Sequence, residues 1–408
     1  QRDRGFFVQE EFNYNDIAII TAGLRGDKSS RNGDANKLYY YPKLSGAFNI
    51  HQLPSWSSDK ISQLKLRAAY GQSGNFAPFG AIYTPLPPVV FNGTTGSLID
   101  LTRGNESIGP ERQSELETGI DLGFLRNRFT LELTYYIKKV EDLLLNVQVP
   151  TSSGFTFAWK NVATINNHGV EVGFNAIPID KNGWRWTSEI NFWKNTAKVT
   201  RLDVPAFNTG AFGASLGTYR IQEGKSPTQI VGVAGPNDKV DPESGLAVFG
   251  DAEPDFQISF MENLTYKNWE FNVLMHWKQG GKNINLTTLL SDLFGTSPDY
   301  DDFTLDPTKA LSNGPYRLNS PSAEPWVQDA SYFRVREIGL RYHLPREWFK
   351  NVADVRVGFS GRNLINVFKY NGYDPEVSNF GTNAISSNVD VTPFPSSKSF
   401  NFDISVNF

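Results

Sequence analysis

Residues 129–138 of the chain read Phe-Thr-Leu-Glu-Leu-Thr-Tyr-Tyr-Ile-Lys, and this stretch decides the fold class. An apolar residue or a ring occupies every second position from Phe129 to Ile137, and mainly polar residues occupy the positions between. Successive side chains of a β-strand point to opposite faces, so the stretch predicts a strand with one apolar and one polar face. A helix would instead repeat its apolar positions every three or four residues.

The same alternation returns along the chain, and no segment has a helical period of comparable quality. It is found at 115–124, 169–176, 184–192, 256–266, 269–277, 354–360 and 400–408. Many runs reach about 10 residues, the length of a tilted strand that crosses a bilayer, whereas strands of soluble proteins average about 5–6 residues. The pattern predicts an all-β fold, and by itself it fits a sandwich, a propeller or a membrane barrel.

The composition excludes several classes of function. The 408 residues include 39 Lys and Arg against 43 Asp and Glu, which gives a net charge of −4 and no cationic field for nucleic acid. The absence of Cys excludes disulfides and thiolate metal sites, and the four His have no paired spacing. No stretch approaches the roughly 18 apolar residues of a membrane helix. We therefore expect no cofactor, apart from a Ca²⁺ ion that the oxygen-rich segment 237–245 could bind.

The connections between the predicted strands alternate in length. The short ones are 13–16, 51–60, 125–128, 180–183, 266–268 and 345–353; the long ones are 26–37, 74–111, 201–254, 284–328 and 368–396, with 140–168 intermediate. Bacterial outer-membrane barrels have short periplasmic turns at one rim and long extracellular loops at the other. The connections therefore favour a transmembrane antiparallel β-barrel over a soluble sandwich.

A consistent up-and-down order accounts for about thirteen strands. They are 6–13, 17–26, 38–50, 61–73, 113–124, 129–149, 162–178, 184–200, 255–266, 269–283, 330–344, 353–366 and 398–408. The strand-like segment 218–232 would break this order, so we place it outside the barrel as an extracellular hairpin with 246–250. Bacterial barrels have an even number of strands, so we expect further strands outside this sequence.

Several segments carry a family resemblance. Residues 332–345 read Tyr-Phe-Arg-Val-Arg-Glu-Ile-Gly-Leu-Arg-Tyr-His-Leu-Pro, and Gly-Arg-Asn-Leu at 361–364, Tyr-Asn-Gly-Tyr-Asp-Pro-Glu at 370–376 and a terminal strand at 398–408 follow them. This order resembles the C-terminal strands of SusC/RagA-type TonB-dependent transporters. Further segments similar to the family or its wider superfamily are 41–50, 111–123, 161–173 and 254–256.

The resemblance implies a fold and a function. Such transporters have 22-stranded barrels with a plugged lumen, so residues 1–408 would be the C-terminal part, with the plug and the N-terminal strands absent from this chain. It implies a location in the outer membrane of a Gram-negative, Bacteroidota-like bacterium, in contact with its lipid. It further implies TonB-dependent import of a glycan, an oligosaccharide or an oligopeptide together with a SusD-like lipoprotein, with TonB acting through the missing N-terminal part. No enzyme activity is expected.

Ligand contacts are expected in the long loops. Aromatic rings stack on sugars, and carboxylates bind hydroxyl groups. The candidate residues are Tyr300, Tyr316, Trp326, Asp299, Asp301 and Asp302. The same side chains could instead contact the lipoprotein or only order their loop.

Two further groups of residues are assigned to the membrane. The terminal alternation resembles the signal that barrel-assembly machinery recognises, and it equally fits residues that simply face lipid: Phe400, Phe402, Ile404, Val406 and Phe408. Aromatic residues collect at membrane interfaces, and the candidates for such a girdle are Trp184, Trp186, Trp269, Trp277 and Tyr266.

Other motifs carry little weight, and two rival functions stay open. Gly-Ala-Ser-Leu-Gly at 213–217 lacks the preceding strand and following helix of a nucleophile elbow, and segment 237–245 lacks the spacing of an EF-hand. The rivals are a non-transporting outer-membrane receptor or adhesin barrel and a secreted all-β glycan-binding protein or hydrolase. A hydrolase would require two carboxylates in one cleft, and the sequence pairs none.

Overall fold

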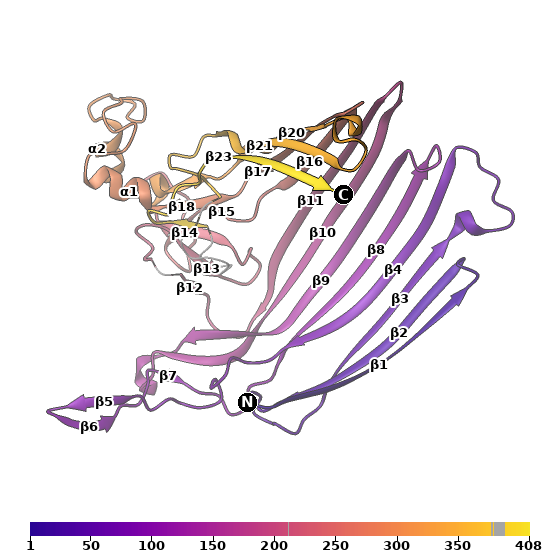
Figure 1. The fold of residues 1–408 in the computed structure, drawn as a ribbon. Coiled ribbons are helices and arrows are strands. Elements are labelled where there is room, and N and C mark those ends of the chain that lie inside the picture. The colour runs from indigo at the N-terminus through magenta and orange to yellow at the C-terminus, as the bar shows by residue number, and fades with distance from the viewer. Residues whose placement is uncertain (211, 377, 379–387) are drawn as a thin grey trace.

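The computed structural model describes residues 1–210, 212–376, 378 and 388–408. One curved antiparallel sheet dominates it (Figure 1). Of the sheet's 14 strands, all but β7 (Thr102–Arg103) follow one another in chain order, which leaves thirteen. They are β1 (Asp3–Tyr14), β2 (Ala18–Ser29), β3 (Tyr39–Asn49), β4 (Ile61–Asn75), β8 (Glu111–Phe124), β9 (Phe129–Gln148), β10 (Phe157–Lys181), β11 (Trp184–Leu202), β16 (Phe256–Tyr266), β17 (Trp269–Gln279), β20 (Tyr332–His343), β21 (Asp354–Phe368) and β23 (Ser399–Asn407).

These strands confirm the thirteen that the alternation predicts, in the predicted order. The register aligns apolar positions across neighbours: Leu133 of β9 lies opposite Ile120 of β8 and Val172 of β10. A slip of one residue would turn every side chain of a strand to the other face. The alternation therefore determines the pairing as well as the strands.

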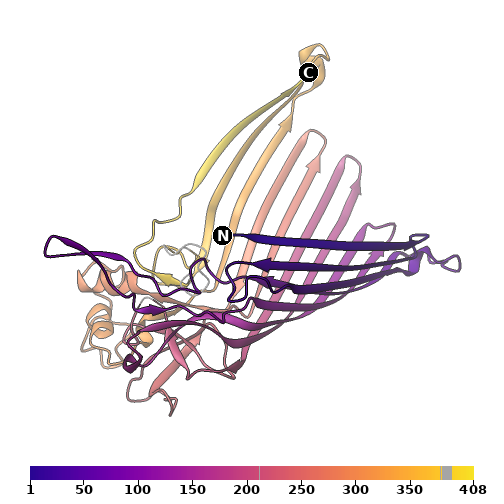
Figure 2. The ribbon, with the colours of Figure 1, turned by 90° about the horizontal axis from the view of Figure 1, so that it is seen from below.

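The two ends of the sheet differ as expected (Figures 1 and 2). Short turns join strand pairs at one end, which we call the turn end, and longer segments emerge at the other, the loop end. The turn between β10 and β11 consists of Asn182 and Gly183, with φ of 54° and 79°. A two-residue turn of this type needs positive φ at both positions, and asparagine followed by glycine adopts them at little cost. The N-terminus lies at the loop end and the C-terminus at the turn end.

The connection between β9 and β10 is shorter than the intermediate length expected from the sequence. β9 continues to Gln148, and β10 begins at Phe157. Register shifts between Asn161 and Ala163 and between Ala163 and Ile165 interrupt the alternation of β10. A bulge inserts a residue without ending the strand, so the period is lost while the pairing continues.

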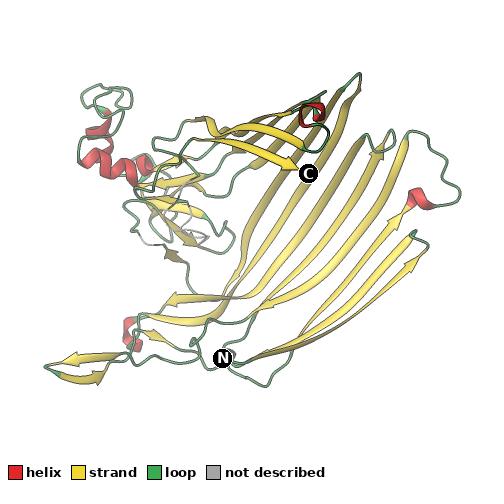
Figure 3. Cartoon of the chain, viewed as in Figure 1, coloured by secondary structure: helices red, strands yellow, loops and turns green. Residues whose placement is uncertain are grey.

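The loop end carries small structures of its own (Figure 3). β12 (Phe207–Thr209), β13 (Thr218–Ile221), β14 (Gln229–Val233) and β15 (Leu246–Asp251) form a separate four-stranded sheet. Segments 218–232 and 246–250 therefore lie outside the large sheet, as predicted. The predicted hairpin of one strand with another is wrong in detail, because 218–232 forms two strands, β13 and β14, and β14 pairs with β15. β18 (Lys282–Asn285), β19 (Val327–Asp329) and β22 (Val389–Asp390) form a three-stranded sheet, and β5 (Pro88–Phe91) and β6 (Thr94–Ser97) form a hairpin.

Two short helices also lie in the loops, where the sequence showed no convincing helical period. They are α1 (Leu286–Leu293) and α2 (Asn313–Leu318). Six to eight residues give about two turns, too few to establish a period. Within the described residues, no helix has both the length and the hydropathy needed to cross a membrane.

Apolar side chains are distributed unevenly between sheet and loops. A buried apolar cluster lies among the loop elements and contains Tyr219, Ile230, Ala252, Ile284, Leu286, Val327 and Val389. On the large sheet, by contrast, the apolar face is open: Phe402 is 69% exposed and Ile404 is 60% exposed. We call the elements β12–β15, β18, β19, β22, α1 and α2 the loop layer. This layer has an apolar core of its own, whereas the apolar face of the sheet lacks cover within the described residues.

Candidate functional site

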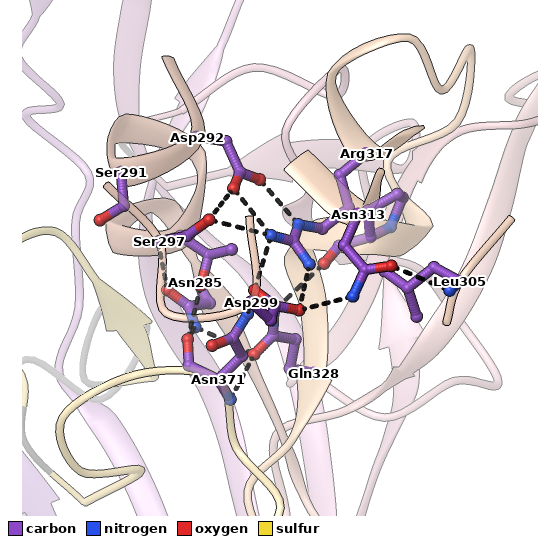
Figure 4. Close-up of polar contacts among 12 residues, drawn as sticks. Asn285, Ser291, Asp292, Ser297, Asp299, Leu305, Asn313, Arg317, Gln328 and Asn371 are labelled. Carbon is purple, nitrogen blue, oxygen red and sulfur yellow. Dashed lines mark hydrogen bonds and ion pairs between the residues drawn. The ribbon is translucent and has the colours of Figure 1, made fainter. Parts of the chain in front are cut away.

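Arg317 organises the loop that holds the predicted ligand residues (Figure 4). Its Nε and Nη2 each donate to the Asp292 carboxylate at 2.7 Å, and Nη1 and Nη2 donate to Asp299 at 2.8 and 2.9 Å. The side chains of Arg317 and Asp292 are 5% and 0% exposed. A guanidinium matches two carboxylates through its fixed fork of donors, so this ion triad fastens α1 to α2.

Three asparagines extend the cluster to a distant part of the chain. Asn313 and Asn371 each donate from Nδ2 to Asp299 at 3.1 Å. Asn285 donates to the Asn371 carbonyl at 2.6 Å, and its side-chain oxygen caps α1 by accepting from the Thr288 N–H at 2.9 Å. Burial opposes ionisation of Asp299, but hydrogen bonds from Arg317, Asn371 and Asn313 outweigh it and lower the pKa of this carboxyl. Asp299 therefore stays charged as part of the loop's framework.

The structure separates the six predicted ligand residues. Tyr300 lies against Gly314, where a Cβ would come within 2.1 Å of the tyrosine ring. Trp326 is 4% exposed and buried in the loop layer, whereas Tyr316 is 37% exposed. Asp301 and Asp302 are exposed. Asp299 and Trp326 thus contact the loop itself, Tyr316, Asp301 and Asp302 remain open to a ligand, and ligand contact stays a prediction for all six.

A second buried ion pair joins β20 to segment 370–376. Arg334 donates to both oxygens of Asp374 at 2.6 and 3.1 Å, and these side chains are 3% and 1% exposed. Arg336 binds Glu376 at 2.6 Å. Burial opposes ionisation of Asp374, but the hydrogen bonds from Arg334, from the Glu376 N–H and from Ser396 lower its pKa. The two acids of the Tyr-Asn-Gly-Tyr-Asp-Pro-Glu motif therefore anchor this segment to the sheet.

A cavity of about 1260 Å³ lies at the loop end, beside the start of β10. Its wall combines aromatic rings, cations, amides and an acid: Tyr83, Trp159, Arg103, Lys160, Asn105, Asn161 and Glu106. Asn161 fixes the wall by exchanging two hydrogen bonds of 3.0 Å with the Gly109 backbone. Rings for stacking and a few convergent polar groups are typical of sites that bind polar organic ligands.

A second hollow, of about 650 Å³, lies on the polar face of the sheet. Its charged lining consists of Glu115, Glu117, Glu132 and Glu171 with Arg67 and Lys138. Arg67 binds Asp121 at 2.9 Å, and Tyr136 donates to Asn195 at 3.0 Å. The polar face of the strands thus presents a charged wall.

Sequence reasoning missed the cavity residues Tyr83, Arg103, Trp159 and Lys160. It identified 74–111 as a long loop, but it did not foresee that β7 pairs in parallel with β10 through Thr102 and Phe157. That contact joins segments more than 50 residues apart. An aromatic residue next to a lysine at 159–160, at the tip of a strand hairpin, was the one local signal available.

The remaining predictions concern metals and the apolar face. Within the described residues, no group of three or more His, Cys, Asp and Glu side chains could hold a metal ion; Ca²⁺ binding by 237–245 stays a prediction. Trp184 stacks on Tyr266 at 4.1 Å and Trp269 lies 4.5 Å from Tyr342 at the turn end, whereas Trp277 lies 5.2 Å from Phe256 near the loop end. Rings thus collect at both borders of this face.

The apolar side chains of the terminal strand, β23, lie on the same face of the sheet. Phe402 pairs with Phe359, and Phe408 is 95% exposed. Phe400, Phe402, Ile404 and Val406 are all exposed on that face. Their recognition by assembly machinery stays a prediction.

Comparisons of the sequence with known proteins find a family model and several relatives. The family model described as "TonB dependent receptor-like, beta-barrel" matches residues 1–364. TonB-dependent receptor P26 of Formosa agariphila is 27% identical over 94% of this chain and 43% of its own length. TonB-dependent receptor SusC of Bacteroides thetaiotaomicron is 23% identical over 96% of this chain and 42% of its own length. The chain therefore spans less than half the length of these relatives.

Solved structures share the fold. The structure of the RagAB peptide transporter matches with a TM-score of 0.81 at 22% identity and covers 99% of this chain and 47% of that chain. The outer membrane transporter YddB from Escherichia coli matches with a TM-score of 0.53 at 12% identity, over 98% of this chain and 44% of that chain.

Proposed function

Because this chain belongs to the TonB-dependent receptor-like β-barrel family, we propose that it supplies wall and outer loops to an outer-membrane importer of large polar nutrients. The cargo is a glycan, an oligosaccharide or an oligopeptide. A SusD-like surface lipoprotein covers the loop end, and TonB acts through a part of the protein outside this sequence. The loop end faces the cell exterior and the turn end faces the periplasm.

The cavity at the loop end is the observation that carries this proposal. A volume of about 1260 Å³ exceeds what a metabolite of one ring fills. Tyr83, which is 66% exposed, offers a ring for stacking, while Arg103, Lys160 and Glu106 offer both signs of charge. Such a lining suits an oligomer of sugars or amino acids. The charged wall farther along the polar face supports a hydrated path for it.

The exposed apolar face argues for a membrane protein rather than a secreted binding protein. Side chains such as Phe402 and Ile404 would form a continuous apolar patch in water, and soluble monomers rarely expose patches larger than a few hundred Å². In a bilayer the same face contacts lipid at no cost. Rings at both borders of the face support this placement.

Uptake by the intact protein tests the proposal. Cells that carry the full receptor gene should import a labelled oligosaccharide or oligopeptide, and Tyr83→Ala with Arg103→Ala should raise the half-saturating cargo concentration by roughly tenfold, as expected when about 1–2 kcal/mol of contacts is lost. Leu86→Ala, an exposed residue that is not in the lining, is the matched control. Equal uptake by the double variant and the control would reject the cavity as the cargo site.

Copurification distinguishes an importer from a plain receptor. The intact protein, extracted in detergent, should be recovered with a surface lipoprotein. Solubility as a monomer without detergent would reject the membrane placement itself. Recovery of an assembled barrel that imports none of the two cargo classes would favour the non-transporting receptor.

A further inference from the structure

The apolar face of the sheet ends in basic side chains at its loop end. Along β9 this face runs from Phe129 to Ile137, and its next position is Lys139. Lys139 pairs with Asn166 of β10, which pairs with Lys198 of β11. Lys194 lies four residues before Lys198 and therefore on the same face. We call Lys139, Lys194 and Lys198 the basic patch; all three are exposed.

The basic patch begins where the aromatic border ends. Phe192 lies 5.8 Å from Phe256, which lies 5.2 Å from Trp277. Lys194 is the next residue after Phe192 on the same face of β11. Aromatic rings of a membrane protein occupy the headgroup level, so the lysines lie at or just beyond that level.

The spacing allows the three ammonium groups to converge. Lys139 and Lys198 are two strand spacings apart, about 10 Å between Cα atoms, and Lys194 is about 13 Å from Lys198 along β11. Lysine side chains extend by about 6 Å and bend toward a polar layer. A single multivalent anion above Asn166 and His168 can therefore be approached from three sides.

The charge of the patch is largely uncompensated. Lys139 binds Glu141 at 2.6 Å. In the described part of the chain, Lys194 and Lys198 take part in no ion pair. At the turn end of the same face the strands carry one basic residue, Lys181. The two borders of this face thus differ in charge although both carry aromatic rings.

We propose that the basic patch binds the phosphate groups of a glycolipid in the outer leaflet of the membrane. The proposal rests on the membrane placement given above, which puts the loop end at the outer leaflet. Lysine is a compact charge suited to phosphate, and basic side chains near an anionic surface gain attraction at close range. Continuity with the apolar face selects a lipid, because its acyl chains would cover Tyr135, Ile137 and Phe192 while its phosphates meet the lysines.

The test measures lipid retention by the intact receptor. The receptor and the triple variant Lys139→Gln/Lys194→Gln/Lys198→Gln are placed in nanodiscs that contain lipopolysaccharide with a phosphorylated lipid A or the same lipid after dephosphorylation. Bound glycolipid is quantified by mass spectrometry after dilution into glycolipid-free discs. We expect affinity to fall by about fivefold for each lysine removed. Lys181→Gln, on the same face at the opposite border, should bind as the unmodified receptor does.

Three results would overturn the proposal. They are equal retention by the triple variant, equal binding of the dephosphorylated lipid, and binding of inorganic phosphate alone at the patch with similar affinity. A charge-retaining variant, Lys198→Arg, should restore binding to the level of Lys198 and so separates charge from packing. Cargo uptake does not enter these measurements. A receptor that fails to enter the discs at all would instead reject the membrane placement.

Discussion

The large sheet and the loop layer of this molecule are stabilised in opposite ways. In the sheet, polar backbone groups pair in long ladders and the apolar side chains stay exposed on one face. In the loop layer, apolar side chains such as Tyr219 and Ile230 are buried together, and buried charges such as Arg317 and Asp292 are paired. The apolar face of the sheet lacks cover within the described residues, whereas the loop elements bury apolar side chains against one another.

Loss of the Arg317 guanidinium is expected to have the largest effect, and only on the loop side. Arg317→Ala leaves the buried Asp292 unpaired, and breaking a buried pair in this way typically costs about 3–5 kcal/mol. Amide exchange of Leu286–Leu293 should accelerate strongly while β16 and β17 stay protected. Arg185→Ala removes an exposed pair with Asp180 and should cost about 0–1 kcal/mol. Unchanged exchange of α1 in Arg317→Ala would contradict the framework role.

A charge on the apolar face should affect the sheet instead. Phe359→Arg places a cation on the face that we propose contacts lipid, and the expected cost is about 2–4 kcal/mol near the middle of a bilayer. Urea unfolding of the full receptor in lipid vesicles measures it. Ser360 is the next residue along β21 and lies on the opposite, polar face, so Ser360→Arg should be tolerated. A similar loss of unfolding free energy in both variants would mean that both faces of the sheet contact the same surroundings.

The helix caps give a smaller, matched contrast within the loop layer. Asn285 caps α1 through the Thr288 N–H, whereas Ser312 at the start of α2 makes no side-chain capping bond. Asn285→Ala should cost about 1 kcal/mol from the cap alone, and more because Asn285 also binds Asn371 and Gln328. Ser312→Ala should change little. The rate of limited proteolysis between the two helices measures both effects. Equal cleavage rates in the two variants would refute the capping role of Asn285.

Acid is expected to have the smallest effect at ordinary pH. The pKa of Asp299 is lowered from 3.8 in the folded loop. A lowered pKa contributes stability that is present above the unfolded value and is lost as the pH falls through the folded value. The susceptibility of the loop to pepsin should therefore stay constant between about pH 5 and 4 and rise well below pH 3.8. In Asp299→Asn this pH dependence should be lost. A rise above pH 5 would show that another group controls the loop.

The sequence predicted the sheet well because its evidence is local. Thirteen strands, their order and the exclusion of 218–232 and 246–250 from the large sheet all follow from a period of two and from turn lengths. The two short helices and the bulges of β10 escaped because each is too short to establish a period. The alternation also placed the terminal Phe402 and Ile404 on the exposed face, where the structure has them.

The loops resisted prediction because their contacts are distant in sequence. The carboxylate of Asp299, a predicted ligand contact, binds Arg317 and Asn371, and the ring of Trp326, another predicted contact, is buried; ligand contact by either residue stays a prediction. Tyr83 and Trp159 line one cavity although 76 positions separate them. No local pattern marks such pairs.

The sequence by itself therefore determined which residues form strands, which face of each strand is apolar and where the chain turns, since a β-strand exposes its two faces at alternate positions. Only the tertiary structure decided which loop charges are neutralised inside the protein and which remain free, because a buried ion pair depends on partners that the chain brings together from far apart. The basic patch combines both: alternation puts Lys139, Lys194 and Lys198 on one face, and the register of β9, β10 and β11 makes them neighbours.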